Sequence, residues 1–286
     1  MTRHSFSVNM CIYYFTIKLV YILKITIYQI SIVWSVLLSH NDDFVSILLI
    51  NHVFSEIFKR RDNHEVLFRR INTFLIKNNL IRNNIVDLGA WIGDNSIPWA
   101  KNSDGVVYAI DPSNDNCEFI NKTCELNKIL NVKVIQCAIS NINELLTTND
   151  DINHCSFVYR NVGLNGQNKV NAVSLDYLYG VKTIDNIGYI HLDVEGMEYK
   201  VLEGSSKLID ECRPIISFEQ HLEIDDYDII LSYLKNKGYS VFLVDEILIG
   251  CRHDCRNSFA FPNEIFNETL IENIHSYIGK NILIPK

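Results

Sequence analysis

A short run of the chain combines an acidic side chain with two glycines ahead of an expected helix. In NIVDLGAWIGDNSIPWA, residues 84–100, Asp87 ends a short apolar strand, and the turn that follows contains Gly89 and Gly93. Glycine has no Cβ, so such a turn lets a ligand approach the main chain closely. We expect this turn to border a ligand, although an ordinary strand-to-helix turn would explain two glycines equally well.

The spacing in this turn distinguishes between classes of ligand. A dinucleotide-binding turn reads G-x-G-x-x-G and holds a pyrophosphate at a helix N-terminus. Here the pattern is D-x-G-x-x-x-G, with Ala90 and Trp91 after the first glycine. The carboxylate of Asp87 would repel a phosphate but would attract a cation. The sulfonium amino acid of S-adenosylmethionine is a ligand of that kind.

A second acidic residue follows at the offset expected for a ribose. The next apolar segment, VVYAID, ends in Asp111, and an acid about twenty residues after the glycine turn binds ribose hydroxyls in nucleoside-binding α/β folds. Asp87 and Asp111 together predict an adenosine-type cofactor.

Two later apolar segments also end in polar side chains. IGYIHL is followed by Asp193 and Glu195, and PIISF is followed by Glu219 and His221. The carboxyl ends of parallel strands meet at one edge of a sheet, so we expect these side chains to surround a single cleft. Taken singly, each would equally well be a helix cap or a loop acid.

The segments that must position these residues alternate between strands and helices. Strands are expected at 85–88, 106–110, 132–139, 187–192 and 214–218, with SVFLV and SFAF completing the sheet as an antiparallel edge pair. This alternation predicts right-handed crossovers and a doubly wound parallel sheet. The polar region at 140–180 predicts an irregular or hairpin insertion with one strand at 155–159.

The N-terminal region differs from the rest. Residues 11–38 are strongly apolar, but Lys18 and Lys24 interrupt them, and a central lysine costs roughly 2.5–3.5 kcal/mol on membrane insertion. This segment is a membrane anchor, a buried helix or strand pair, or an unstructured extension. We expect a cytoplasmic protein, with membrane association through residues 11–38 as the alternative. Apolar side chains at three- and four-residue intervals predict helices over 41–83.

The length of 286 residues allows one large domain with appendages. We divide the chain into an apolar segment at 1–40, helices at 41–83, an α/β domain at 84–262 and a helical tail at 263–286. The net charge of −8 argues against a nucleic-acid partner, because such binding needs lysine and arginine to neutralise phosphates. The sequence does not indicate the oligomeric state.

The eight cysteines are scattered and form no CxxC pair, which suits a reducing compartment. Cys251, His253 and Cys255 are the one tight cluster, and a metal role is an alternative there to an ordinary surface turn. No metal ligand is assigned.

Five segments together resemble a known family. DLGAWIG, AIDPS, SLDYL, HLDVEGMEYKVLEG and PIISFEQH resemble, in order and separation, the FkbM-type S-adenosylmethionine-dependent methyltransferases. The resemblance covers about residues 84–221, with a weaker continuation to 262, and LDVEGMEYKVLEG is its most specific part. It implies a class I methyltransferase (Rossmann-like) fold, with a seven-stranded sheet whose last strand is antiparallel. It also implies methyl transfer, chiefly to hydroxyl oxygens of sugars or natural products.

The resemblance assigns roles to individual residues. Those on the cofactor side are Asp87, Gly89, Ala90, Gly93, Asp111, Pro112, Cys137, Ala138 and Asp193. Those on the acceptor side are Asp193, Glu195, Glu219 and His221. Trp91 departs from the expected pattern, because it is a bulky residue inside the cofactor turn. It would either stack over the cofactor or narrow the cofactor pocket.

A hydroxyl acceptor has a high pKa and benefits from a general base. We expect His221 or Asp193 to be that base, with Glu195 and Glu219 orienting the acceptor. The alternative for His221 is a structural hydrogen-bonding role, and paired carboxylates could instead hold a divalent cation.

Three functions remain open from sequence. The favoured one is a methyltransferase acting on a small-molecule or glycan hydroxyl. The others are a methyltransferase acting on protein or nucleic acid, and a non-catalytic binding protein that retains the fold. The last would require a damaged cofactor site, yet every acid and glycine of the pattern is present.

Overall fold

The computed structural model describes residues 36–40, 45–49, 64–148, 168–223, 226–248 and 251–286. Most of the apolar segment at 11–38 and the strand predicted at 155–159 lie outside these residues. Among the described helices, none combines the length and apolar content that a membrane crossing needs.

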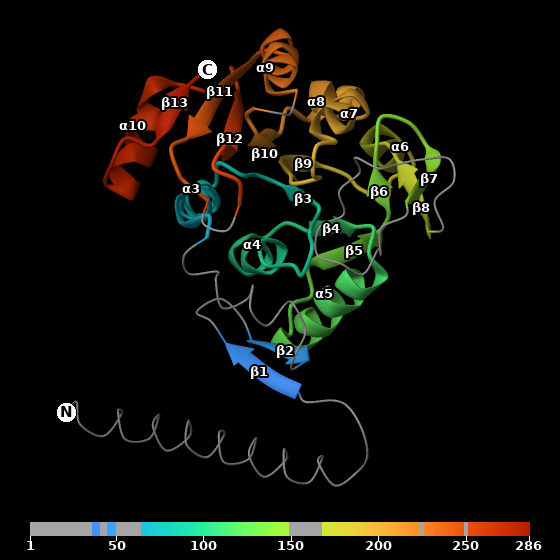
Figure 1. Cartoon of the computed structure of the whole chain (residues 1–286). Helices are drawn as coiled ribbons and strands as arrows, with labels where there is room; N and C mark the ends of the chain where they lie inside the picture. Colours follow the sequence, from blue (N-terminus) through green and yellow to red (C-terminus); the bar gives the residue numbers. More distant parts are fainter. Residues whose placement is uncertain (1–35, 41–44, 50–63, 149–167, 224–225, 249–250) are drawn as a thin grey trace, which may run out of the picture.

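A mixed sheet of eight strands forms the centre of the molecule (Figure 1). In spatial order its strands are β13 (Leu283–Pro285), β11 (Tyr239–Val244), β12 (Cys255–Pro262), β10 (Ile215–His221), β9 (Ile187–Leu192), β3 (Asn84–Leu88), β4 (Val107–Asp111) and β5 (Val132–Gln136). The five strands from β10 to β5 are parallel, whereas β12 is antiparallel to both of its neighbours. The predicted doubly wound α/β fold with an antiparallel last strand is confirmed, and β13 extends the sheet by one strand.

The position of β12 differs from the edge pairing predicted for it. It lies between β10 and β11 instead of at the edge, and its consecutive Phe259, Ala260 and Phe261 side chains are fully buried. A strand whose residues are apolar on consecutive positions is typical of a sheet interior, because both of its faces are covered.

Helices cover both faces of the sheet. One face carries α3 (Val66–Lys77), α4 (Ser96–Asn102), α5 (Asn114–Asn127) and α10 (Glu268–Ile278). The other carries α6 (Leu175–Gly180), α7 (Glu198–Glu203), α8 (Ser206–Cys212) and α9 (Tyr227–Asn236). Within β3, Val86 and Leu88 pack on the second group of helices, while Ile85 packs on the first. Asp87 shares the face of Ile85 because side chains alternate along a strand.

Three short elements differ from the predicted ones. The strand expected at 132–139 is broken at Cys137: β5 stays in the main sheet, and β6 (Ala138–Ile139) joins a small sheet with β7 (Glu144–Thr148) and β8 (Asn168–Val173). Within 41–83, where helices were expected, the described residues form β2 (Val45–Leu49), which pairs with β1 (Val36–His40) in a hairpin, and later α3, while residues 50–63 lie outside the described part of the chain. The C-terminal region is helical only as far as α10, and both α10 and β13 share a core with α3.

Candidate active site at the strand ends

Four predicted site residues lie in one row across the carboxyl ends of neighbouring parallel strands. Leu88 of β3 is paired with Ile110 of β4 and with Leu192 of β9, and Leu192 is paired with Phe218 of β10. The residues that follow these are Asp111, Gly89, Asp193 and Glu219. The strand register therefore brings side chains from four separate parts of the sequence to one edge of the sheet.

The turn after β3 is held closely against β9. Gly89 has φ +75°, and a Cβ placed on it would lie 1.9 Å from the carbonyl oxygen of Asp193. The Gly89 and Ala90 amides both donate to the carbonyl oxygen of Ile110, at 3.0 and 3.1 Å. The Gly93 amide closes the turn on the Ala90 carbonyl at 2.7 Å. Gly89 is thus required by the close approach of two strands as well as by its backbone conformation.

Asp111 organises the backbone around it. Its Oδ2 accepts from the Trp91 amide at 2.9 Å, and its Oδ1 accepts from the Ser113 amide at 2.8 Å and from Asn116 Nδ2 at 3.0 Å. Burial raises the pKa of Asp111 to about 6. Trp91 has φ +45°. Its main-chain amide, which donates to Asp111 Oδ2, holds this bulky residue of the turn next to the acid predicted to bind the ribose.

Asp87 lies in the layer beneath this row and is 2% exposed. Ser96, the first residue of α4, donates a hydrogen bond from its hydroxyl to Asp87 Oδ2. Burial is the main reason that the pKa of Asp87 rises to about 7, and the nearby carboxylates of Asp94, Asp111 and Glu65 raise it further. The ionised form of Asp87 is therefore costly in the protein as it stands.

This shift predicts a pH-dependent stability effect. A carboxyl group whose pKa is higher in the folded chain stabilises the fold at low pH, and this contribution is lost as the pH rises towards 7. Asp87→Asn has no carboxyl group to ionise, so it keeps its stability as the pH rises while wild type loses this contribution. The free energy of unfolding of Asp87→Asn, measured relative to wild type, should therefore increase by about 1–3 kcal/mol between pH 5 and pH 8. Urea denaturation at the two pH values measures this change.

Asp104→Asn is the matched control, because Asp104 is exposed and lies just before β4, at the amino ends of the parallel strands. Its stability relative to wild type should be the same at both pH values. An equal pH response in both variants would show that Asp87 is not the group responsible.

The loop after β9 is held by the second glutamate of its D-V-E-G-x-E motif. Glu198, which is 3% exposed, accepts from the Val194 and Gly196 amides through Oε1, both at 3.2 Å. Its Oε2 accepts from Gln220 Nε2 at 2.9 Å. Glu195 takes the uncommon φ of +54° within this loop. Glu198 thus fixes the segment that presents Asp193 and Glu195.

The acceptor-side acids lie close enough to perturb one another. Burial, followed by the charges of Glu219 and Glu195, raises the pKa of Asp193 well above its usual range. Burial and the charge of Glu65 raise the pKa of Glu219 in the same way. Concentrated negative charge of this kind is stabilised by a cation. This group of acids is therefore suited to a positively charged ligand.

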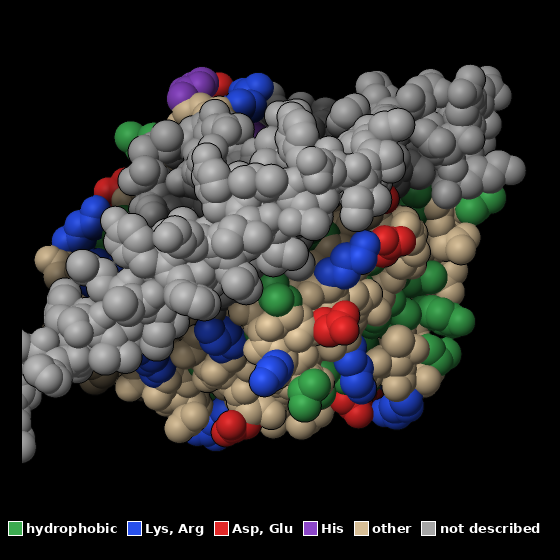
Figure 2. Space-filling view, turned by 90° about the horizontal axis from the view of Figure 1, so that it is seen from below, with side chains coloured by type: hydrophobic (Ala, Val, Ile, Leu, Met, Phe, Trp, Pro, Cys, Tyr) green, Lys and Arg blue, Asp and Glu red, His purple; other side chains and the backbone are tan. Residues whose placement is uncertain are grey.

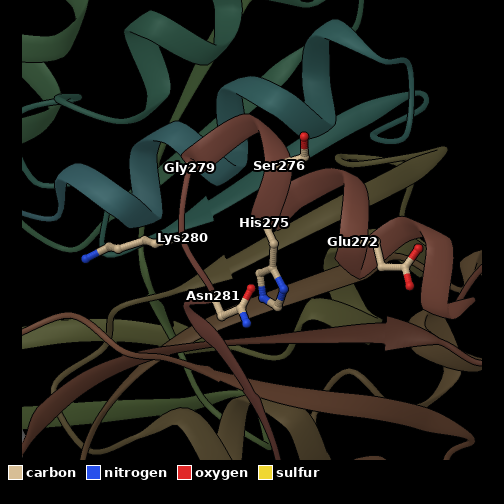
Figure 3. Close-up of a pocket in the computed structure, with 6 residues that line it drawn as sticks. All are labelled: Glu272, His275, Ser276, Gly279, Lys280 and Asn281. Atoms are coloured by element: carbon tan, nitrogen blue, oxygen red, sulfur yellow. The ribbon is translucent and has the colours of Figure 1, made fainter.

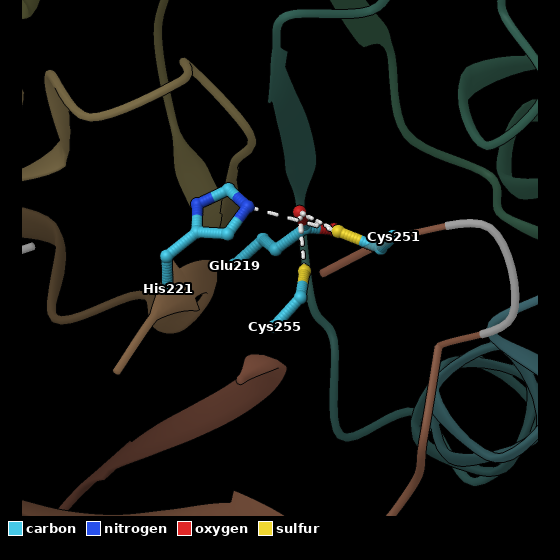
Figure 4. A group of neighbouring side chains, drawn as sticks. All are labelled: Glu219, His221, Cys251 and Cys255. Carbon is cyan, nitrogen blue, oxygen red and sulfur yellow. Dashed lines mark hydrogen bonds between the residues drawn. The ribbon is translucent and has the colours of Figure 1, made fainter. Parts of the chain in front are cut away.

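His221 and Glu219 both face two cysteines (Figure 4). The Cys255 thiol donates to Glu219 Oε1 at 2.9 Å, and Cys251 Sγ lies 3.7 Å from His221 Nε2. His253, which the sequence grouped with the cysteines, instead lies 3.0 Å from a carboxylate oxygen of Glu223.

The remaining predicted cofactor residues lie beyond Asp111. Gln136 of β5 pairs with Asp111, and its side chain reaches the Pro112 carbonyl at 3.5 Å. Cys137 follows it and is 8% exposed. Ala138 belongs to β6 and pairs with Ala172 in the small sheet, so it lies where the chain leaves the main sheet.

Several residues of the site were not predicted. Glu65, just before α3, accepts from Asn257 Nδ2 at 2.9 Å and is 3.3 Å from Arg69, which also contacts Asp94 at 2.7 Å. Glu65 and Asn257 are separated by 192 positions, and no local motif marks either of them. Buried His191, which burial shifts to a pKa of about 4, hydrogen-bonds Ser217 beneath the row. In the sequence, His191 is a single histidine in the apolar segment IGYIHL, and nothing there indicated its hydrogen bond to Ser217.

A separate surface pocket of about 420 Å³ lies at the end of α10 (Figure 3). Its lining residues are Glu272, His275, Ser276, Gly279, Lys280 and Asn281. His275 Nε2 accepts from the Leu283 amide at 3.2 Å, which fixes the chain between α10 and β13. This pocket contains none of the residues of the row.

Comparison of sequences identifies a family. The model for the methyltransferase FkbM domain matches residues 87–241, more than half of the chain. The match begins at Asp87 and ends within β11. No protein of curated function matches this chain.

Solved structures that are similar to this chain include the following three. A methyltransferase FkbM from Methylobacillus flagellatus has 18% identity and a TM-score of 0.46, covering 66% of this chain and 47% of its own. TYW2 from M. jannaschii, in complex with AdoMet, has 16% identity and a TM-score of 0.46, covering 80% and 86%. A precorrin-6y C5,15-methyltransferase from Geobacter metallireducens has 13% identity and a TM-score of 0.40, covering 69% and 88%. This chain thus spans about half the length of the Methylobacillus structure.

Proposed function

The chain belongs to the FkbM methyltransferase family, and from this premise we propose that it transfers a methyl group from S-adenosylmethionine to a hydroxyl oxygen. The acceptor would be a sugar, a glycan or another small metabolite. The observation that carries the proposal is the row of Asp111, Gly89, Asp193 and Glu219 along adjacent strand ends. It places a close backbone turn between an acid suited to a ribose and a group of acids suited to a cation.

The chemistry of these residues fits the cofactor. Asp111 Oδ2 accepts one hydrogen bond from the protein, and a carboxylate oxygen can accept two, which leaves capacity for a ribose hydroxyl. With a pKa of about 6, Asp111 is mainly ionised at neutral pH. Asp193 and Glu195 would supply the negative charge that a sulfonium requires.

S-adenosylmethionine supplies, when bound, an electrophilic methyl group on a cationic sulfur. The protein must then align the acceptor oxygen and remove its proton, and alignment alone can contribute about 7–11 kcal/mol. We assign proton removal to a carboxylate oxygen of Asp193, since this residue adjoins the Gly89 turn and its raised pKa makes it a stronger base than an ordinary aspartate. Glu195, on the loop fixed by Glu198, would orient the acceptor.

The surface charge supports a small acceptor over a nucleic acid. The net charge is −8. Figure 2 shows one face of the molecule, on which the visible Lys and Arg side chains are interspersed with Asp and Glu. A nucleic-acid groove needs a continuous positive surface, and the described residues visible on this face do not form one.

Calorimetric titration with S-adenosylhomocysteine tests the cofactor assignment. We expect micromolar binding to the wild-type chain and roughly 10- to 100-fold weaker binding to Asp111→Ala, because the variant loses one or two hydrogen bonds to a charged group. Thermal melting of each protein verifies that it is folded.

Asp115→Ala is the matched control, since Asp115 is exposed in the first turn of α5 and lies four positions from Asp111. It should bind like wild type. A folded wild-type chain that does not bind S-adenosylhomocysteine would refute the proposed function and favour a binding protein that retains the fold. If binding is found, a screen of glycans and hydroxylated metabolites with a radiolabelled methyl donor identifies the acceptor class.

A further inference from the structure

Four side chains with metal-ligating atoms converge where β10 ends and β12 begins. They are Glu219, His221, Cys251 and Cys255, and their ligand atoms all lie within 4.8 Å of one another (Figure 4). We propose that these four residues form a tetrahedral zinc site, which ties the β11–β12 connection to the end of β10. The sequence grouped the cysteines with His253 and assigned no metal ligand, so this set differs from the predicted cluster.

The distances suit a zinc ion. Zinc–sulfur bonds of about 2.3 Å and zinc–nitrogen or zinc–oxygen bonds of about 2.0–2.2 Å place tetrahedral ligand atoms about 3.3–3.8 Å apart. Cys251 Sγ lies 3.7 Å from His221 Nε2 and 3.8 Å from Glu219 Oε1. The contact of 2.9 Å between Cys255 Sγ and Glu219 Oε1 is a thiol hydrogen bond. That contact would lengthen by roughly 0.6 Å to accommodate the metal.

The ligand types select the metal. Two thiolates, one imidazole and one carboxylate are the donors that zinc takes in tetrahedral sites, whereas calcium and magnesium require oxygen ligands throughout. Binding requires both thiols to lose their protons, which pass to solvent as Zn²⁺ takes up the two sulfur lone pairs. The charge of the bound ion would then be offset by the two thiolates and Glu219.

The backbone holds most of the ligands in place. His221 and Cys255 are directly paired across β10 and β12, and Glu219 lies two residues before His221 on the same strand. Cys255 is fully buried. Cys251 comes from the turn before β12, where its amide donates to the Leu248 carbonyl at 3.2 Å. Three ligands on paired strands, with a fourth on the adjoining turn, form a preorganised site.

A second group of possible ligands nearby provides an internal comparison. Glu223, His253 and Asp254 also lie close together, but Arg252 is 2.9 Å from Asp254 and 3.9 Å from Glu223. A guanidinium among these carboxylates already provides the positive charge and would repel a metal. His253 is therefore the natural control for His221.

The zinc site determines which residue is free to act as the general base. This consequence rests on the proposed function. Metal coordination would occupy His221 Nε2, so that this nitrogen could not take a proton from an acceptor. Of the two bases predicted from sequence, Asp193 alone would then be available. The metal site itself does not depend on methyl transfer.

Metal analysis of the full-length chain tests the proposal. The protein is kept in a non-chelating phosphine reductant, incubated with Zn²⁺, passed through a desalting column and analysed by plasma mass spectrometry. We expect about one zinc per wild-type chain, and at least about a tenfold lower content in Cys251→Ser and His221→Ala. His253→Ala should retain the wild-type content. Replacing zinc with Co²⁺ should give the intense visible bands of a tetrahedral ion and a thiolate charge-transfer band.

Cys251→Ser keeps the test valid if other variants fold poorly, because Cys251 is only partly buried and lies in a turn. Wild-type zinc content no higher than that of Cys251→Ser would overturn the proposal. Equal loss of zinc in His253→Ala and His221→Ala would do the same, as would a Cys251–Cys255 disulfide that persists in the reductant. Titration with S-adenosylhomocysteine on the same samples separates the two ideas. A chain that binds zinc but no nucleoside keeps the metal site and refutes the proposed function.

Discussion

Gly89→Ala is expected to reduce the affinity for S-adenosylhomocysteine by at least about 100-fold, which corresponds to about 2.7 kcal/mol. The new Cβ would lie 1.9 Å from the Asp193 carbonyl oxygen and 2.9 Å from the carbonyl carbon. Both atoms belong to the backbone, so a side-chain rotation cannot relieve the clash. Either the turn or the start of the Asp193 loop must move, so the distance between the two sides of the proposed site changes. Calorimetric titration measures the loss, and urea denaturation measures the accompanying destabilisation.

Two glycine variants separate the clash from the cost of the backbone conformation. Gly279→Ala places a Cβ at φ +88° with nothing within 4 Å, and Gly180→Ala has neither a positive φ nor a near neighbour. We expect Gly279→Ala to lose about 1–2 kcal/mol of stability without affecting affinity, and Gly180→Ala to change neither. Binding by Gly89→Ala within a few-fold of wild type would show that the ligand does not depend on this turn.

The sequence was sufficient to predict the elements that carry strong local patterns. The strands ending at Asp87, Asp111 and Leu192 were recognisable as buried apolar runs, and the strand register then aligned their ends. Alternation of strand and helix leaves few possible topologies. The fold class therefore followed from periodicity, and the row of acids followed from the rule that strand ends share an edge.

The parts that could not be predicted depend on contacts between distant residues. The bond from Asn257 to Glu65 joins positions 192 apart, and no spacing rule connects them. His253 was grouped with Cys251 and Cys255 because of its proximity in sequence. His253 lies in the turn before β12, where it contacts Glu223, and the pairing of β12 with β10 brings His221 to Cys255 instead. A ligand set formed across two strands becomes visible only when their register is known.

Asp193→Asn is expected to lower turnover by about 10²- to 10⁴-fold, the usual contribution of a general base, with an acceptor taken from the screen. The amide keeps the size and backbone of aspartate, including the carbonyl oxygen next to Gly89, but cannot take up the proton. The raised pKa of Asp193 also predicts the pH profile. Wild-type activity should fall as the pH drops through that raised value, because the protonated carboxyl is inactive, and this acidic limb should be absent from the residual activity of Asp193→Asn.

Affinity for S-adenosylhomocysteine distinguishes loss of a base from loss of the site. It should stay within a few-fold of wild type in Asp193→Asn, and the exposed Asp104→Asn control should match wild type in both turnover and affinity. His221→Gln tests the alternative, in which His221 is the base. Near wild-type turnover in Asp193→Asn, together with a 100-fold or greater loss in His221→Gln, would transfer the role of base to the histidine. Since a metal-bound imidazole cannot act as that base, the same outcome with the zinc content unchanged in His221→Gln would also contradict the zinc site.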